Sequence, residues 1–412
     1  MDKERVEESW EYAEADTQYH VHGIHPYPAR MIPQIANRLI RERSKVGETV
    51  LDPFCGSGSV LAEALLLGRN AIGSDINPLA HLIAKVKTTP LESTELDLSS
   101  QKLLNNVKIK IELRRRGSYK APIPYFKNIF HWFTKDVIEE LAIVKQQIDS
   151  AFPPLSESRL RDFFQACFSM TIRKTSNIAF EDNPYFIRAM TAEDLMNHSP
   201  DVLATFEKQV ANGVQRVKEF SALCPKNVKS SVLLADSRAL PLDDTSVNLI
   251  VTSPPYGEES HTMSYSRFAK LSLLWMGMTS YEINRYVKKT LGGDIIEPRP
   301  YSKLLDNTVK AVSKKSKARA KEIFSFFWDY AKCLNQMFRV MAHGGYCCIV
   351  IGDRSAAGVT ITNGDLTREL GKLSGFEPVQ TYQREIPKKV LPRKDYKTEL
   401  INRESIIIMR KP

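Results

Sequence analysis

Two short segments of this sequence combine residue types that are suited to binding a ligand and transferring a chemical group. They are Asp52-Pro53-Phe54-Cys55-Gly56-Ser57-Gly58 and Thr252-Ser253-Pro254-Pro255-Tyr256. A Gly-rich turn between a strand and a helix lets backbone N–H groups approach an anionic ligand. In the second segment two prolines remove N–H donors and leave carbonyl oxygens as acceptors, beside a hydroxyl and an aromatic ring. Both segments are therefore candidate ligand sites.

The first segment is followed by an acid at a spacing typical of nucleotide binding. Asp75 lies 17 residues after Gly58, close to the spacing at which a carboxylate binds ribose hydroxyls. The segment departs from the dinucleotide fingerprint GxGxxG because position 61 is Leu, and no Gly-Lys-Ser/Thr follows as in a P-loop. A lone GxG often marks an ordinary turn, so the case for a cofactor depends on this acid and on the second segment.

The second segment directly follows an apolar run at 247–251 that is typical of a strand. Ser-Pro-Pro-Tyr by itself is also compatible with an inert polyproline II turn at the surface. Its position favours a ligand site, because ligands bind at the carboxyl ends of parallel strands in α/β sheets.

Strand and helix patterns alternate around both segments. Strands are predicted at 46–55, 70–75, 231–236, 247–252, 346–353 and 404–409, and helices at 59–67, 265–276 and 321–341. This alternation argues for an α/β fold with a doubly wound sheet. Residues 97–225 differ, because strand signals are weak there and helical stretches prevail. We interpret 1–96 and 226–412 as two parts of one catalytic domain and 97–225 as a large helical insertion, a candidate target-recognition region.

The first segment and its acid carry a family resemblance. DPFCGSG followed by GSDINP resembles motif I and the next strand of the S-adenosylmethionine-dependent amino-methyltransferases. In that family the loop holds the methionine part of the cofactor and the acid holds the ribose. The resemblance implies a Rossmann-like class I methyltransferase sheet, S-adenosyl-L-methionine as cofactor, and cofactor-binding roles for Asp52, Phe54, Gly56, Gly58 and Asp75.

The second segment resembles motif IV of the same family, written (D/N/S)PP(Y/F/W). The Ser form is typical of the enzymes that methylate N4 of cytosine in DNA, and the Asp form of N6-adenine enzymes. The resemblance implies catalytic roles for Ser253, Pro254, Pro255 and Tyr256. Hydrogen bonds from the target amine to the Ser253 oxygen and the Pro254 carbonyl favour a more nucleophilic nitrogen. Tyr256 is expected to stack on a base that has left the DNA helix.

Three further segments support the resemblance less strongly. Asp236 lies where an acid of the family commonly faces the cofactor adenine, and a solvated loop acid is an equal alternative. The segment at 25–30, HPYPAR, resembles one that precedes motif I in many N4-cytosine enzymes and packs against the methionine end of the cofactor; a Pro-rich entry loop is the alternative. The segment 265–272 resembles a helix after SPPY, in which Arg267 and Lys270 either face DNA or are solvated.

The charge distribution fits a polyanionic partner. The net charge is +10, and residues 277–322 hold 11 Lys and Arg against 5 Asp and Glu, which suits phosphate contacts. This basic insertion is densest at Lys314, Lys315, Lys317, Arg319 and Lys321. We expect double-stranded DNA with a flipped target base as the partner, with a cognate restriction enzyme as a candidate second partner.

Other composition features narrow the class of protein. No run of about 18 apolar residues predicts a membrane span, and the acidic start of the chain lacks the apolar core of a signal peptide, so a cytoplasmic location is expected. The six cysteines show neither CxxC pairs nor His/Cys ligand spacing, and no metal site is predicted.

The leading hypothesis is a site-specific DNA methyltransferase acting on N4 of cytosine. N6-adenine methylation is an alternative, because the Ser and Asp forms of the motif do not separate substrates perfectly. RNA methylation is another, since DPFCGSG also occurs in tRNA guanine-N2 methyltransferases, although no THUMP-type pattern is evident here. A catalytically inactive nucleic-acid-binding module is disfavoured because both motifs are intact.

Overall fold

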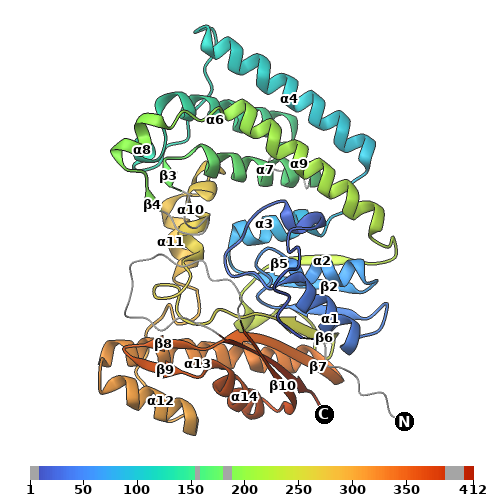
Figure 1. Ribbon diagram of the computed structural model, residues 1–412, viewed down its shortest axis with the longest axis vertical. Helices are drawn as coiled ribbons and strands as arrows, with labels where there is room; N and C mark the ends of the chain where they lie inside the picture. Colours follow the sequence, from blue (N-terminus) through green and yellow to red (C-terminus); the bar gives the residue numbers. More distant parts are fainter. Residues whose placement is uncertain (1–8, 154–157, 180–187, 386–402) are drawn as a thin grey trace.

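The computed structural model describes residues 9–153, 158–179, 188–385 and 403–412. Its centre is a seven-stranded sheet with the order β10-β11-β7-β6-β1-β2-β5 (Figure 1). The strands are β1 (Thr49–Asp52), β2 (Asn70–Asp75), β5 (Ser230–Leu234), β6 (Val247–Thr252), β7 (Met341–Gly352), β10 (Glu377–Glu385) and β11 (Arg403–Arg410). All six strands predicted from the sequence are present in this sheet, so the doubly wound α/β class is confirmed.

Five neighbouring strands, β5, β2, β1, β6 and β7, run parallel, and β11 runs antiparallel to both of its neighbours. The central strands read as short apolar runs because parallel sheets are covered on both faces. In register, Asp52 pairs with Gly73 and Leu51 with Ile250. The carboxyl ends of β1, β2 and β6 therefore meet at one edge of the sheet, which brings the two predicted segments together.

Alternate residues of the strands pack against different helices. Cys348 and Val350 of β7 belong to the core that contains α1 (Pro33–Arg43), α2 (Ser59–Leu66) and α3 (Pro78–Lys87). Cys347 and Ile349 belong to the core beneath α13 (Lys317–Val340) and α14 (Asn363–Leu373). This two-residue alternation is the period of a strand, and it confirms that the sheet is sandwiched between two helical layers.

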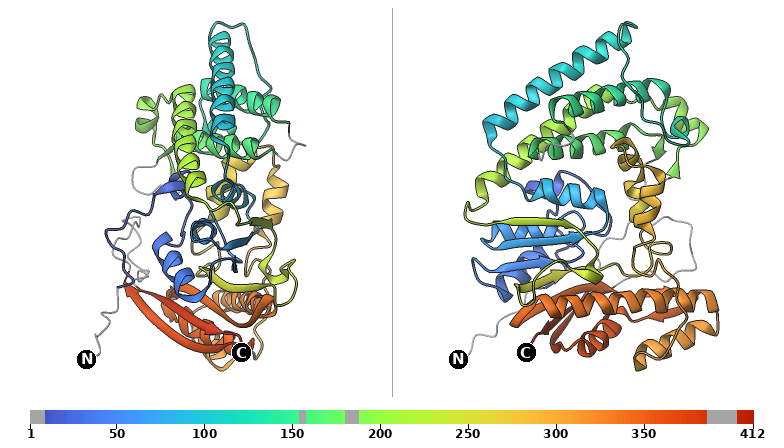
Figure 2. Two further views of the ribbon diagram at one scale, coloured as in Figure 1. Left: turned by 90° about the vertical axis from the view of Figure 1, so that its right-hand side faces the viewer. Right: turned by 180° about the vertical axis from the view of Figure 1, so that it is seen from behind.

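The residues between β2 and β5 are mostly helical beyond α3. The helices are α4 (Ser93–Arg115), α5 (Ile129–Trp132), α6 (Lys135–Ala151), α7 (Arg159–Thr175), α8 (Ala192–Asn197) and α9 (Val202–Leu223). Figures 1 and 2 show them stacked at one end of the molecule, above the sheet, with a two-strand hairpin, β3 (Ile178–Ala179) and β4 (Arg188–Ala189). Helix α4 begins four residues before the predicted boundary at 97. The division of the chain at 97 and 225 stays a prediction.

The basic insertion is also largely helical. After α10 (Tyr265–Trp275) come α11 (Ser280–Val287) and α12 (Lys303–Ser313), and the turn after α12 leads into α13. Helices α10 and α11 stand between the helices of residues 93–223 and the β7–β11 side of the sheet (Figures 1 and 2). A small hairpin, β8 (Arg354–Ala356) and β9 (Val359–Ile361), lies at the end of β7. No helix of the described residues is long and apolar enough to cross a membrane.

Candidate active site

A cleft opens at the carboxyl edge of the sheet, with an empty volume of about 940 Å³ that includes space open to solvent. The predicted site residues that line it are Asp52, Phe54, Gly56, Asp75, Asp236, Ser253 and Pro255. The fold thus brings the two motifs, which lie two hundred residues apart in sequence, to the walls of one cavity. Gly58, Pro254 and Tyr256 do not line this cleft.

Asp52, the last residue of β1, is buried beside the last residue of β6. Its Oδ1 accepts hydrogen bonds from Thr252 Oγ1 at 2.6 Å and from the Phe54 N–H at 3.1 Å. Burial raises the pKa of the Asp52 carboxyl to about 7, although these hydrogen bonds oppose the shift. Loss of water costs a carboxylate more free energy than a neutral carboxyl, so this acid takes up a proton at a higher pH than an exposed aspartate, and a nearby cation would favour its ionised form.

The Gly-rich turn needs its glycines for two different reasons. Gly56 has a φ of +48°, and a Cβ there would lie 3.1 Å from the Tyr27 ring in the cleft. Gly58 has a φ of +78°, and its Cβ would lie 3.0 Å from the Ala84 Cα of α3. Gly56 therefore keeps the cleft open, whereas Gly58 allows α2 to pack closely against α3.

The acid at the end of β2 supports the same turn. The Gly56 N–H donates to Asp75 Oδ2 at 3.0 Å, and the Asn77 N–H donates to Oδ1 at 2.8 Å. Burial raises the pKa of the Asp75 carboxyl to about 6 against the effect of these bonds. Each carboxylate oxygen has a second lone pair, so Asp75 can accept hydrogen bonds from hydroxyl groups in the cleft while it holds the loop.

Asp236 reaches the cleft from the start of a short 3-10 helix, η2 (Ser237–Ala239). It is half-buried and forms an ion pair with Arg238 at 2.7 Å, and Arg238 in turn binds Asp329 of α13. Burial alone would raise the pKa of Asp236, but the hydrogen bonds and charge of Arg238 outweigh burial and lower it. Asp236 is therefore an ionised acceptor held at the wall of the cleft.

The side chains of the Ser-Pro-Pro-Tyr segment diverge. Ser253 is half-buried and lines the cleft, and its Oγ lies 3.5 Å from the Tyr256 hydroxyl. Tyr256 points into a neighbouring cavity, where its hydroxyl donates to Glu404 Oε1 at 2.8 Å, and Glu404 is paired with Arg384 at 3.1 Å. Burial and the Glu404 charge raise the pKa of Tyr256 well above its ordinary value. Ser253 lines both cavities, so it stands at their junction.

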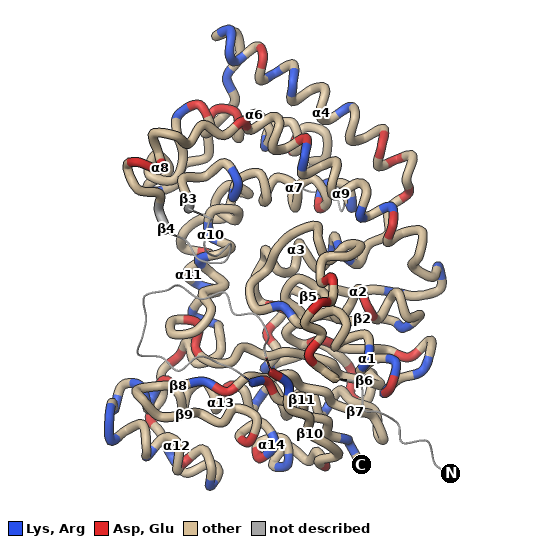
Figure 3. The backbone as a smooth tube through the Cα atoms, in the orientation of Figure 1, with Lys and Arg blue, Asp and Glu red and all other residues tan. Residues whose placement is uncertain are grey.

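The basic residues singled out in the sequence separate into two groups. Arg319 is paired with Glu322 and Glu258, and Lys321 is paired with Glu297. Lys314, Lys315 and Lys317 are exposed at the turn between α12 and α13, and within the described parts of the chain they have no ion-pair partner. Figure 3 shows the cations of this turn at the outer end of α12 and α13.

Comparisons with known proteins identify the family. A family described as DNA methylase matches residues 2–86. The Type II methyltransferase M.MvaI of Kocuria varians is 30% identical over 423 residues, which cover 96% of this chain and 90% of that protein. This chain belongs to the DNA amino-methyltransferase family. The Type II methyltransferase M.BsoBI of Geobacillus stearothermophilus is 24% identical over 66% of this chain and 55% of its own length.

Among solved structures, a DNA modification methylase of Thermus thermophilus, TTHA0409, in complex with S-adenosyl-L-methionine is 19% identical, with a TM-score of 0.23 over 43% of this chain and 54% of that one. The sheet of the methyltransferase is Rossmann-like, with the single antiparallel strand β11 between β10 and β7. S-adenosyl-L-methionine is its cofactor.

The cleft of the methyltransferase suits this cofactor chemically. S-adenosyl-L-methionine carries a sulfonium, an ammonium and a carboxylate group on one side and a ribose and adenine on the other. The N-terminal turn of α2 offers N–H groups for the carboxylate, the buried acid Asp52 offers charge for the cations, and Asp75 offers acceptors for the ribose hydroxyls. Asp236 offers an acceptor on another wall. The residues present therefore fit the group.

Some further residues of the cleft lie in segments that the sequence analysis identified, and others were not identified from the sequence. Tyr27 of the HPYPAR segment lines the cleft and stacks on Tyr265, with ring centroids 5.8 Å apart. Glu259, Tyr286 and Lys289 also line it and were not singled out. Glu259 follows the Ser-Pro-Pro-Tyr segment closely and could have been noted, whereas nothing in the sequence pattern indicates Tyr286 or Lys289.

Proposed function

We propose that this protein transfers a methyl group from S-adenosyl-L-methionine to the exocyclic N4 amine of cytosine at specific sites in double-stranded DNA. The observation that carries the proposal is the position of Ser253 at the junction of two cavities. One cavity holds the acids and glycines of the cofactor loop. The other, about 580 Å³ in empty volume, is bounded by the Tyr256 ring and suits a flipped base.

The chain's part in the reaction is to orient an amine and accept its hydrogen bonds. Ser253 Oγ and the Pro254 carbonyl accept from the two amine protons, and neither proline can offer a competing N–H. The cofactor supplies the methyl group on a positively charged sulfur. On transfer, the amine would take the methyl group as the S–C bond of the cofactor breaks, and it would release one proton to water. Most of the acceleration comes from holding the two groups in line.

The serine form of the motif supports cytosine rather than adenine as the target. N6 of adenine is the alternative, because it is an exocyclic amine with the same two protons to be held. The names of the relatives fit a Type II modification enzyme, so we also propose a partner restriction enzyme that cleaves the same site.

The deciding experiment incubates the purified protein with labelled S-adenosyl-L-methionine and genomic DNA, digests the DNA to nucleosides and identifies the product by mass spectrometry. N4-methylcytosine is the expected product. N6-methyladenine would keep the mechanism but overturn the inference from Ser253. Label that appears only in an RNA sample would overturn the DNA substrate itself.

A further inference from the structure

Helix α11 presents a row of hydrogen-bonding and cationic side chains to solvent. They are Tyr281, Asn284, Arg285 and Lys288. Their i, i+3, i+4 and i+7 spacing places them along one side of the helix, and all four are exposed. The opposite side buries Ile283 and Tyr286 against the core. We call the exposed row the α11 stripe.

The acids that the structure describes do not neutralise the α11 stripe. Among the residues that the structure describes, no side chain forms a hydrogen bond or ion pair with any of its four members. Glu282 is the one acid in the sequence of α11. Its Oε2 accepts from the Thr279 N–H at 2.7 Å and from Thr279 Oγ1 at 2.8 Å, which completes the capping box of the helix. Both cations of the stripe are exposed and lack an acidic partner within the described ranges, on a helix whose start is fixed by its capping box.

The α11 stripe ends where the catalytic cleft begins. Lys288 is the last member, and the next residues, Lys289, Thr290 and Leu291, line the cleft that contains Ser253. From the buried side, Tyr286 also reaches the cleft. Figure 3 shows further Lys and Arg positions along α10 and α11. A polyanion lying on the stripe would therefore pass next to the entrance of the active site.

We propose that α11 is a DNA-reading helix, which binds the major groove beside the target base through Asn284 and Arg285 and contacts a phosphate through Lys288. This inference rests on the proposed function. The residue types of α11 are those that read base edges. Arginine forms bidentate hydrogen bonds with guanine O6 and N7, and asparagine does so with adenine N6 and N7. A helix of eight residues is about 12 Å long, which the major groove accommodates.

The α11 stripe and the exposed turn at Lys314, Lys315 and Lys317 differ in chemistry. The turn carries only lysines, which bind phosphates as point charges and carry no sequence information. The stripe adds a guanidinium, an amide and an aromatic ring, and the guanidinium and amide can bond base edges in a bidentate manner. Of these two surfaces, the α11 stripe has the chemistry to read bases, and the lysine turn contributes affinity that does not depend on sequence.

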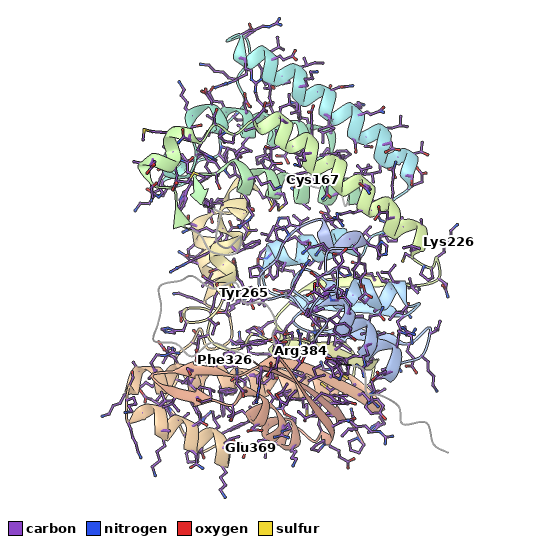
Figure 4. All side chains as sticks on the ribbon, in the orientation of Figure 1. Cys167, Lys226, Tyr265, Phe326, Glu369 and Arg384 are labelled. Carbon is purple, nitrogen blue, oxygen red and sulfur yellow. The ribbon has the colours of Figure 1, made fainter. Side chains whose placement is uncertain are left out.

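The test compares two double variants, each of which removes two positive charges. The first variant is Arg285→Ala/Lys288→Ala, and the matched control is Lys226→Ala/Lys229→Ala, which removes two exposed lysines next to β5. Figure 4 labels Lys226 at the side of the molecule away from α11. The probe is a short duplex carrying a site that the wild-type protein methylates, mapped beforehand on genomic DNA, with a tRNA sample as the second probe.

The expected result is a loss of duplex affinity of roughly 5- to 150-fold in the first variant. The slope of log affinity against log salt concentration should also become shallower by about one unit for each phosphate that the variant no longer binds. The control variant should behave like the wild-type protein. Binding of S-adenosyl-L-methionine, measured by calorimetry, should be unchanged in both. Arg285→Lys keeps the charge but not the bidentate geometry, so it should bind DNA yet methylate a broader set of sites on sequencing.

Two results would overturn the inference, and they are distinguishable. If wild-type protein methylates DNA but the Arg285→Ala/Lys288→Ala variant keeps its affinity, salt slope and site preference, α11 does not touch DNA while the proposed function stands. If the wild-type protein binds and methylates only the tRNA probe, both the function and the inference fail. A variant that misfolds is replaced by Arg285→Lys, whose altered site preference supports the inference and whose unchanged preference contradicts it.

Discussion

Thr252 donates a hydrogen bond to Asp52 over 2.6 Å, and this bond joins the last residue of β6 to the last residue of β1. One strand leads into the cofactor loop and the other into the Ser-Pro-Pro-Tyr segment. The bond is buried, where loss of one partner leaves a polar group without compensation. The relative placement of the cofactor loop and the Ser-Pro-Pro-Tyr segment is therefore fixed at the edge of the sheet by two neighbouring strands.

Substitution of Ser253 by alanine should abolish most of the methyl transfer and leave cofactor binding largely intact. The hydroxyl is at the junction of the cavities, and loss of one preorganised hydrogen-bonding group at a reacting centre costs roughly 100- to 1,000-fold in rate. Single-turnover methylation and cofactor titration measure the two effects. Ser260→Ala removes an exposed hydroxyl from the same loop and serves as the control. Full activity in Ser253→Ala would refute the assigned role.

Cofactor affinity should rise as pH increases towards about 7 and level off above it, because the pKa of Asp52 in the ligand-free protein is about 7. Folding moves the pKa of the Asp52 carboxyl from 3.8 to about 7, so the ligand-free folded protein keeps a proton that the unfolded chain has lost. Stability contributed by this group therefore falls as pH rises from about 4 to about 7. A cation in the cleft favours the ionised carboxylate, so binding should release a proton.

Calorimetry in buffers of different ionisation enthalpy measures that proton release. The Asp52→Asn variant has no carboxyl to titrate, so its cofactor affinity should depend less on pH. Burial also raises the pKa of Asp75, to about 6. The Asp75→Asn variant separates the contribution of Asp75 to the pH dependence of cofactor affinity from that of Asp52. An identical pH dependence in wild type and Asp52→Asn would show that Asp52 is not coupled to the cofactor.

The ring of Tyr256 should matter more than its hydroxyl. In Tyr256→Phe the ring remains and Glu404 keeps its pairing with Arg384, so we expect a modest fall in kcat/KM. Tyr256→Ala removes the ring on which we propose that the base stacks, and base–aromatic stacking contributes about 1–3 kcal/mol per base, so kcat/KM should fall roughly 5- to 150-fold. Steady-state methylation of one DNA duplex by the wild-type protein and both variants gives the two losses in kcat/KM. Equal losses in both variants would instead assign the role to the hydroxyl and Glu404.

The sequence predicted what depends on local pattern. The β1-α2-β2 unit, β6 and the convergence of Asp52, Asp75 and Ser253 follow from short apolar runs, a Gly-rich turn and the rule that parallel strands end at one edge. The strand β10 was not predicted, because it is a mostly exposed edge strand with little apolar alternation. Contacts such as Tyr256 with Glu404, 148 residues apart, arise only when distant elements pack, and a single sequence carries no signal for them.

Neutralising the exposed lysine turn should weaken DNA binding without changing which site is methylated. Lys314, Lys315 and Lys317 face solvent. For each phosphate that is no longer neutralised, the slope of log affinity against log salt should become shallower by about 0.9. Anisotropy titrations at several salt concentrations measure the slope. The matched control is Lys321→Ala, because this lysine is already paired with Glu297. An unchanged slope in the triple alanine variant would locate the phosphate contacts elsewhere on the molecule.

Behind the Ser-Pro-Pro-Tyr loop lies a buried ion pair. Removing one of its partners should destabilise the fold more than replacing both. Glu258 accepts from Arg354 through both oxygens, at 2.8 and 3.1 Å, and each side chain is only 4% exposed. In Arg354→Met the buried carboxylate loses both short contacts to Arg354 and keeps the longer contact to Arg319, at 3.4 Å. Removing one partner of a buried pair costs about 3–5 kcal/mol in free energy of unfolding, whereas replacing both by apolar residues costs far less.

Urea unfolding of Arg354→Met, Glu258→Leu and the double variant measures this coupling. Because Glu258 lies two residues after Tyr256, the single variants should also lose methyl transfer, since an uncompensated charge displaces the loop that carries the catalytic segment. The double variant should recover most of the stability and part of the activity. If it is as unstable as the sum of the single variants, the two residues act independently and the ion pair does not hold the loop.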